Sequence, residues 1–242
     1  MITYGGRTME GSPLFGKRIS VNGDSICQGV GHPGGYVKII AERNSMTYEN
    51  LGIGGGTVAT GIVPKSSAEG KPRHPIAVTV DRMDPDADYA IVEGGVNDAS
   101  LNVIQGTPPI GVMTKGYQGP FDDSTFIGAF ELMLKKLITK YHGKKIGYIA
   151  VHQCAHKFRP TYSGEDNFYR AAIKCCEKWG VPYLDLTSSV PMNGFMREKL
   201  DGDATLEVIT AEYTARGDGT HPNEAGYLAY YCDRIEEWMK TL

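Results

Sequence analysis

The stretch Lys17-Arg18-Ile19-Ser20-Val21-Asn22-Gly23-Asp24-Ser25-Ile26 leads from a strand-like run into a tight turn. Residues 17–23 are typical of a buried strand, because the run is short, has an apolar centre and is bounded by turn-forming residues. Ser25 would then follow the carboxyl end of a central strand, which is the edge where ligands bind in α/β sheets. Its hydroxyl is therefore a candidate nucleophile.

Further strands and helices alternate along the rest of the chain. Short apolar runs bounded by turn residues predict strands, and apolar residues recurring at three- and four-residue steps predict helices. Strands that alternate with helices pair in parallel through right-handed crossovers, which predicts a three-layer α/β/α sandwich. Pro222 is expected at the first position of the last helix. The remaining predicted strands are 46–51, 88–93, 144–151 and 181–186, and the predicted helices are 36–43, 75–83, 124–141, 166–179 and 222–239.

Composition and length favour one α/β domain spanning residues 1–242, with residues 1–16 as an amino-terminal extension. The 242 residues are 41% hydrophobic and 22% charged, and the net charge of -3 argues against a nucleic-acid partner. The chain shows neither a signal-like amino terminus nor an apolar run near the roughly 20 residues of a membrane span, so a cytoplasmic location is expected. Five cysteines, an odd number, favour reduced thiols in or near the core.

A base for the candidate nucleophile lies near the end of the chain, in Asp218-Gly219-Thr220-His221. Serine attacks esters poorly unless a base takes its proton and a third group orients that base. One tight turn can point the Asp218 carboxylate at one imidazole nitrogen of His221 and leave the other nitrogen facing Ser25. The three residues therefore form a candidate catalytic triad.

Acyl transfer also needs hydrogen-bond donors for the oxygen that becomes negative. The second strand ends in the glycine run Gly52-Ile53-Gly54-Gly55-Gly56, where a backbone N–H can approach a substrate closely. The third strand ends in Gly94-Gly95-Val96-Asn97-Asp98, where the Asn97 amide can donate. These two segments are the candidate oxyanion-binding groups.

In their order along the chain, the Gly-Asp-Ser turn, the glycine run, Gly95-Val96-Asn97-Asp98 and Asp218-Gly219-Thr220-His221 resemble the four blocks of the SGNH hydrolase (GDSL esterase/lipase) family. The resemblance implies that Ser25 is both nucleophile and oxyanion donor, that Gly55 and Asn97 are the other donors, and that Asp218 and His221 complete the triad. Gly54 or Gly56 could occupy the place assigned to Gly55. The family's fold is flavodoxin-like with a five-stranded parallel sheet, and neither cofactor nor metal is implied. Ile26 stands where the family name has leucine.

The predicted substrate is a small-molecule or carbohydrate ester with a short acyl group such as acetyl. It is favoured because the long segments 52–74, 99–123 and 187–217, which should wall the site, contain glycine, polar and aromatic residues rather than a long apolar lid helix. Aromatic and basic residues expected on this face are Tyr117, Phe121, Phe158, Arg159 and Tyr162. The other histidines, His32, His74, His142, His152 and His156, are expected to be structural or to border the substrate.

The same sequence features also allow other functions. A lipase or acyl-thioesterase of the same family would use the same residues, whereas a catalytically silent carbohydrate-binding relative would not use them. Residues 29–34 match the G-x-G-x-x-G pattern of dinucleotide-binding proteins. That match is superficial, because Asp24 and Ser25 occupy the strand end where the first glycine of such a site belongs.

Overall fold

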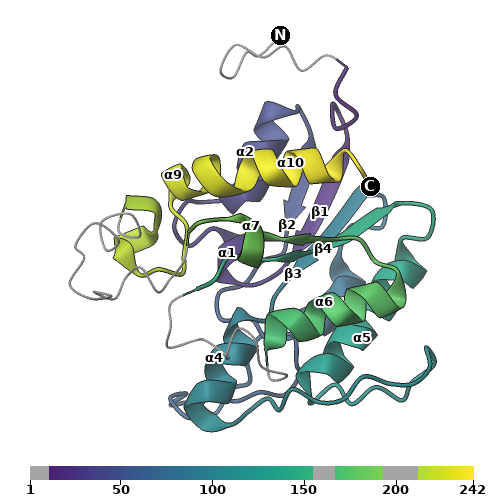
Figure 1. The fold of residues 1–242 in the computed structure, drawn as a ribbon, viewed down its shortest axis with the longest axis vertical. Helices are drawn as coiled ribbons and strands as arrows, with labels where there is room; N and C mark the ends of the chain where they lie inside the picture. The colour runs from purple at the N-terminus through teal and green to yellow at the C-terminus, as the bar shows by residue number, and fades with distance from the viewer. Residues whose placement is uncertain (1–10, 155–166, 193–211) are drawn as a thin grey trace.

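Five parallel strands form the centre of the protein, in the order β2-β1-β3-β4-β5. The computed structural model describes residues 11–154, 167–192 and 212–242 (Figure 1). All five predicted strands are confirmed, and the strand order is that of flavodoxin-like sheets. The strands are β1 (Arg18–Asn22), β2 (Thr47–Asn50), β3 (Tyr89–Glu93), β4 (Lys145–Ala150) and β5 (Tyr183–Asp185).

Helices cover both faces of this sheet, as the three-layer prediction requires (Figure 1). Successive strand residues point to opposite faces, so β1 sends Ile19 and Val21 into one core. That core is completed by α2 (Gly35–Arg43) and α10 (Asp233–Met239). The other core contains Tyr148 of β4, together with α5 (Phe126–Lys140) and α6 (Phe168–Trp179).

Capping residues determine where the two longest described helices, α5 and α6, begin and where α6 ends. The Thr125 hydroxyl accepts a hydrogen bond from the N–H of Gly128 at the start of α5, and the Asn167 side chain accepts one from Arg170 at the start of α6. Gly180 ends α6 in the left-handed conformation at φ 65°. These helices confirm the predictions over 124–141 and 166–179, although Asp166 lies outside the described residues.

The prediction of a long loop over 99–123 was wrong in its first part, where α4 spans Val96–Gln105. Glycines at both ends obscured this helix, because Gly94-Gly95 is typical of a loop. In the structure, Gly95 is the N-cap at φ 117° and Gly106 the C-cap at φ 80°. Two four-residue helices, α1 (Ser25–Gln28) and α7 (Leu186–Ser189), were also missed, because each is too short to show a period.

The last helix is built of three parts, namely α9 (Glu224–Gly226), the π-helical segment η5 (Tyr227–Cys232) and α10. Placing Pro222 at its first position was wrong. Asn223 is the N-cap, because its side chain accepts a hydrogen bond from the N–H of Gly226, and Pro222 instead pairs with Thr214 in an antiparallel bridge. The predicted helix 75–83 is divided into α3 (Ile76–Thr79) and the 3-10 turn η1 (Val80–Arg82).

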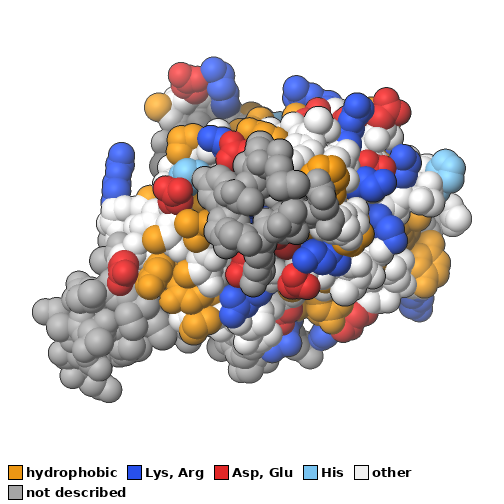
Figure 2. Space-filling model, turned by 90° about the horizontal axis from the view of Figure 1, so that it is seen from above, with side chains coloured by type: hydrophobic (Ala, Val, Ile, Leu, Met, Phe, Trp, Pro, Cys, Tyr) orange, Lys and Arg blue, Asp and Glu red, His pale blue; other side chains and the backbone are white. Residues whose placement is uncertain are grey.

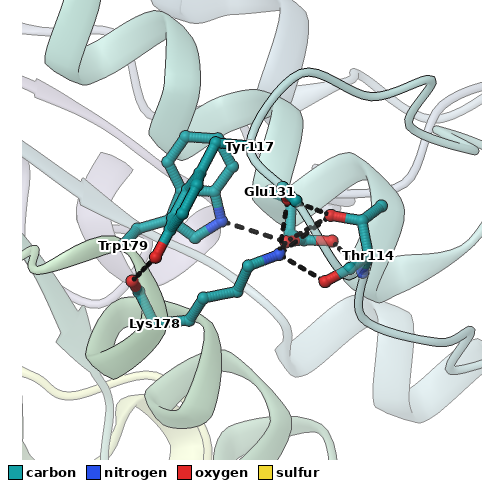
Figure 3. A network of polar contacts seen from close by, with 6 residues as sticks. Thr114, Tyr117, Glu131, Lys178 and Trp179 are labelled. Atoms are coloured by element: carbon teal, nitrogen blue, oxygen red, sulfur yellow. Dashed lines mark hydrogen bonds and ion pairs between the residues drawn. The ribbon is translucent and has the colours of Figure 1, made fainter.

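A buried ion pair connects α5 and α6 to the loop between α4 and α5 (Figure 3). Nζ of Lys178 lies 2.5 Å from Oε1 of Glu131 and also donates to the carbonyl oxygen of Thr114. Trp179 donates to the same Glu131 oxygen, and the ring of Tyr117 packs edge-on against Trp179. Burial raises the pKa of Glu131, but hydrogen bonds from Lys178 and its neighbours outweigh that effect, so the carboxyl pKa lies below its ordinary value. We call this set the Lys178–Glu131 clasp.

Two of the aromatic residues that were expected at the site lie beside the clasp. Tyr117 and Phe121 both pack against Trp179, with ring centroids 5.1 and 5.9 Å away. Phe158, Arg159, Tyr162 and His156 lie outside the described residues.

The cysteine thiols and the charged side chains of the surface agree with an ordinary globular domain. All five cysteines are free and buried, as expected for reduced thiols. Basic and acidic side chains are mixed on the face that Figure 2 shows, rather than gathered by sign. None of the helices in the described residues combines the length and the apolar character needed to cross a bilayer.

Replacing Lys178 with Met should destabilise the protein by about 3 kcal/mol, because it leaves the Glu131 carboxylate buried without its cation. Urea denaturation followed by circular dichroism measures this loss. The double variant Lys178→Met/Glu131→Leu should recover much of the stability, because the charge is then removed as well. A single variant as stable as wild type would contradict a structural role for the clasp.

Candidate active site

Ser25 lies at the carboxyl end of the central strand β1, as the first residue of the short helix α1. The carboxylate of Asp24 caps this helix, because its Oδ1 accepts the N–H of Ile26 at 2.9 Å. The neighbouring strand β3 lies at the point where the sheet order reverses, which is where ligands bind in such sheets. Ser25 is 8% exposed, so its hydroxyl lies at the floor of the site.

A buried carboxyl group, Glu93 at the end of β3, holds the turn that carries Ser25. Its Oε1 accepts the N–H of Cys27 at 2.7 Å and the N–H of Asp24 at 3.3 Å. A methyl group on Gly23 would lie 2.3 Å from Cγ of Glu93, so only glycine fits there. Burial raises the pKa of Glu93 well above its ordinary value, and the nearby Asp24 raises it further. Sequence reasoning missed Glu93, although a carboxylate closing an apolar strand was a visible signal.

The structure brings Ser25, His221 and Asp218 together in one hydrogen-bonded line. Nε2 of His221 lies 2.9 Å from Oγ of Ser25, and its Nδ1 lies 2.6 Å from Oδ2 of Asp218. The other carboxylate oxygen of Asp218 accepts the N–H groups of Thr220 and His221. Burial raises the pKa of Asp218, but hydrogen bonds from His221 outweigh it, so the pKa lies below its ordinary value. The carboxylate therefore stays charged beside the imidazole.

His152, which the sequence left as structural or substrate-bordering, supports the turn that carries His221. It is fully buried after β4, its Nδ1 lies 2.5 Å from the hydroxyl of Tyr231, and it is hydrogen-bonded to the backbone of Gly219. Burial lowers the pKa of His152 to about 4. A neutral ring thus connects η5 to the Asp218–His221 turn.

A second tyrosine of η5 reaches the helix that carries Ser25. The hydroxyl of Tyr227 donates to the carbonyl oxygen of Ile26 at 2.8 Å. Tyr227 and Tyr231 are fully buried and their rings pack edge-on, 5.6 Å apart between centroids. Tyr36 of α2 packs against both rings. The carboxyl-terminal helix therefore contacts both halves of the site.

The three glycines that could serve as a backbone donor differ in their hydrogen bonds. The N–H of Gly54 donates to Oε1 of Gln28, and the N–H of Gly56 donates to the carbonyl oxygen of Ile53. The N–H of Gly55, like that of Ser25, makes no hydrogen bond to the rest of the described chain. Two backbone donors at the site are therefore free to bind another group.

Asn97 and Asp98 follow Val96 in the first turn of α4, and their side chains contact the segment that follows β2. Nδ2 of Asn97 donates to the carbonyl oxygen of Gly56 at 2.9 Å and lies 3.4 Å from Oδ2 of Asp24. The carboxyl of Asp98 accepts the N–H groups of Val58 and Ala59, each at 2.9 Å. Burial raises the pKa of Asp98 to about 7. The structural role of Asp98 was not foreseen.

The glycine pattern of residues 29–34 does not form a strand-to-helix phosphate loop. The helix α1 separates it from β1, and Gly29 ends that helix in the left-handed conformation at φ 84°. Gly34 is the N-cap of α2. These glycines therefore serve the turn between two helices.

A serine hydroxyl, an imidazole and a carboxylate in line, beside free backbone donors, define the site of a serine hydrolase. The sequence matches the GDSL-like lipase/acylhydrolase family over residues 21–229. The chain belongs to this family, and it is a carboxylic ester hydrolase.

Solved structures show the same fold. A Lactobacillus plantarum protein is 25% identical, with a TM-score of 0.69 over 94% of this chain and 98% of that chain. The aryl esterase of M. smegmatis is 16% identical, with a TM-score of 0.58 over 93% of this chain and 99% of that chain. No curated protein sequence matches the chain.

Replacing His152 with Gln should remove a pH-dependent part of the stability. The folded-state pKa of about 4 lies below the ordinary value, so the unfolded chain binds a proton that the folded protein does not bind. The free energy of unfolding should therefore fall as the pH drops from about 6.5 to about 4, by up to about 3 kcal/mol. Urea denaturation of both proteins across this range measures the difference between them.

That difference in free energy should shrink towards low pH for His152→Gln. The exposed His142 offers a matched control, because His142→Gln removes a histidine that is not buried. A wild-type advantage over His152→Gln that stays constant across the range would show that His152 does not remain neutral in the folded protein.

Proposed function

We propose that the protein hydrolyses carboxylic esters through an acyl-enzyme formed on Ser25. The observation that carries the proposal is the unbroken line of hydrogen bonds from Ser25 through His221 to Asp218. His221 is the general base that takes the serine proton, and Asp218 holds the imidazole in the required tautomer and stabilises its cation. The hydroxyl and the imidazole are already within hydrogen-bond distance, so little reorganisation precedes attack.

The oxyanion is stabilised by the N–H of Ser25, the N–H of Gly55 and the side-chain amide of Asn97. One contrast supports Gly55 over its neighbours: its N–H donates to no described residue, whereas the N–H groups of Gly54 and Gly56 already donate to Gln28 and Ile53. Asn97 keeps its bond to Gly56 and can exchange its long 3.4 Å contact with Asp24 for the oxyanion. Donors held in place in this way stabilise charge as it develops.

The reaction proceeds in two halves. Oγ of Ser25 attacks the ester carbonyl carbon while His221 removes its proton, and the resulting tetrahedral intermediate carries its negative charge on the former carbonyl oxygen. His221 then gives the proton to the leaving alcohol, and the C–O bond breaks to leave the acyl-enzyme. Water, deprotonated by the same imidazole, attacks the acyl-enzyme, and the bond between the acyl carbon and Oγ then breaks as His221 returns the proton to Ser25 and the acid is released.

A short acyl group, such as acetyl on a carbohydrate or a small alcohol, is the proposed substrate feature. Residues 51–75, which follow β2 beside the site, contain no helix, so this segment supplies no apolar lid for a long chain. The structural similarity to an aryl esterase makes an aryl acetate a suitable first assay substrate.

Replacing Ser25 with Ala should lower kcat for an aryl acetate by about four powers of ten or more, because the nucleophile is lost. The matched control is Ser12→Ala, since Ser12 precedes β1, at the amino end of the strands, and donates to Asn44. Release of the phenol, followed by absorbance, measures both variants. Substantial turnover by Ser25→Ala would exclude Ser25 as the nucleophile.

Replacing Asn97 with Ala should lower kcat by about 100- to 1000-fold, as loss of one oxyanion donor does. KM should change much less, because the donor acts on charge that appears only in the transition state. Asn102→Ala on the same helix serves as the control, since Asn102 donates to the carbonyl oxygen of Pro108. An Asn97→Ala enzyme with wild-type kcat would remove Asn97 from the oxyanion site.

A further inference from the structure

The guanidinium of Arg73 lies directly beside Gly55. Thr57 and Pro75 form a parallel bridge, which holds the segment of Gly55 beside the segment of Arg73. The N–H of Thr57 donates to the carbonyl oxygen of His74, which secures this pairing. A methyl group on Gly55 would lie 2.2 Å from Nη1 of Arg73, so the cation contacts the backbone of the proposed oxyanion donor.

Arg73 has no acidic partner among the described residues, unlike Arg18 and Arg43. Arg43 pairs with Asp233 and Glu236, and Arg18 pairs with Asp84. The side chain of Arg73 is half-buried, its Nε is buried without a hydrogen bond, and no carboxylate of the described residues pairs with it. A guanidinium stays charged at any pH that proteins tolerate, and shielding such a charge from water is unfavourable unless an anion compensates it.

The hollow that Arg73 lines also suits an anion. Arg73 lines a hollow of about 300 Å³ together with Lys71, the hydroxyl-bearing Ser66 and Ser67, and two prolines. Lys71 pairs with Glu69 at 2.5 Å, so the guanidinium is the uncompensated cation of this lining. Hydroxyl groups and a planar guanidinium are donors that match the oxygens of a carboxylate or phosphate.

We infer that the ester substrate carries an anionic group, of the carboxylate or phosphate type, which Arg73 binds in this hollow. The inference rests on the proposed function, because it takes Gly55 to mark the position of the ester carbonyl. The guanidinium fork would hold the anion through two parallel hydrogen bonds and thereby fix the ester above Ser25. The site would then select short acidic esters over neutral ones.

Two matched pairs of esters test this selection. One pair places the charge on the acyl part, as mono-4-nitrophenyl succinate against 4-nitrophenyl acetate. The other places it on the alcohol part, as 4-acetoxybenzoate against its methyl ester. Each ester is assayed with wild type, Arg73→Gln, Arg73→Lys and Arg18→Gln, the last being a control for loss of an arginine at the amino end of β1, away from the site.

In Arg73→Gln, kcat/KM for at least one anionic ester should fall by about 10- to 100-fold, as expected for loss of a charged hydrogen bond. The neutral partner should lose clearly less than the anionic ester, and its remaining Ser25-dependent turnover also shows that the variant is folded. Arg73→Lys should recover part of the loss, because it restores the charge but not the fork.

Equal losses for the anionic and neutral esters would overturn the inference, because Arg73 would then act through the oxyanion site alone. Unchanged rates for all four esters would overturn it as well. Failure of the proposed function has a different signature, namely that wild type hydrolyses none of the four esters in a way that depends on Ser25.

Discussion

The packing of the carboxyl-terminal helix on α1 and α2 is the constraint on which the site depends. Ser25 and His221 are 196 positions apart in sequence, yet their side chains are within hydrogen-bond distance. Tyr227 connects η5 to the backbone of α1, while Tyr231 connects it through His152 to the backbone of Gly219. The same short segment therefore fixes Ser25 and His221 relative to each other. The wide turn of a π-helix brings these two tyrosines, four residues apart, to one side.

Buried ionisable groups surround this arrangement, and burial moves each of them towards its neutral form. Burial raises the pKa values of Asp24, Glu93 and Asp98 and lowers that of His152. Each group bonds to the backbone of a segment near the site: Asp24 and Glu93 at the Ser25 turn, Asp98 at the loop after β2, and His152 at the turn before His221. Burying these groups costs stability, but their hydrogen bonds hold the reacting groups in position before substrate binds.

Local sequence patterns predicted the parts of the fold that local physics determines. Apolar runs predicted all five strands, and helical spacing predicted α5 and α6, because these patterns reflect burial on one face. Motif residues such as Ser25, Asp218 and His221 could be named in advance, and the structure brings them together. The start of α4 was hidden by its glycine cap.

Supporting residues could not be assigned, because their roles arise from contacts between distant segments. The sequence identifies Glu93 only as the last residue of a strand. Its hydrogen bond with the N–H of Cys27, 66 positions away, becomes visible only in the fold. His152 likewise has no local motif, and its partner Tyr231 is 79 positions away. The chemistry of such side chains is visible in sequence, but their partners are not.

The segment after β2 contains both Gly55, the proposed oxyanion donor, and Arg73, the proposed anion-binding residue. Asp98 fixes Val58 and Ala59, and the pairing of Thr57 with His74 ties the two ends of the segment together. Gly55 and Arg73 are therefore held in place by the same backbone pairing, although 18 positions separate them in the sequence. A shift of the guanidinium would press on the backbone of Gly55, because the two are already in contact. An anion bound at Arg73 would thus reinforce the position of the N–H that faces the ester oxygen, and binding energy away from the reacting bond would contribute to its orientation.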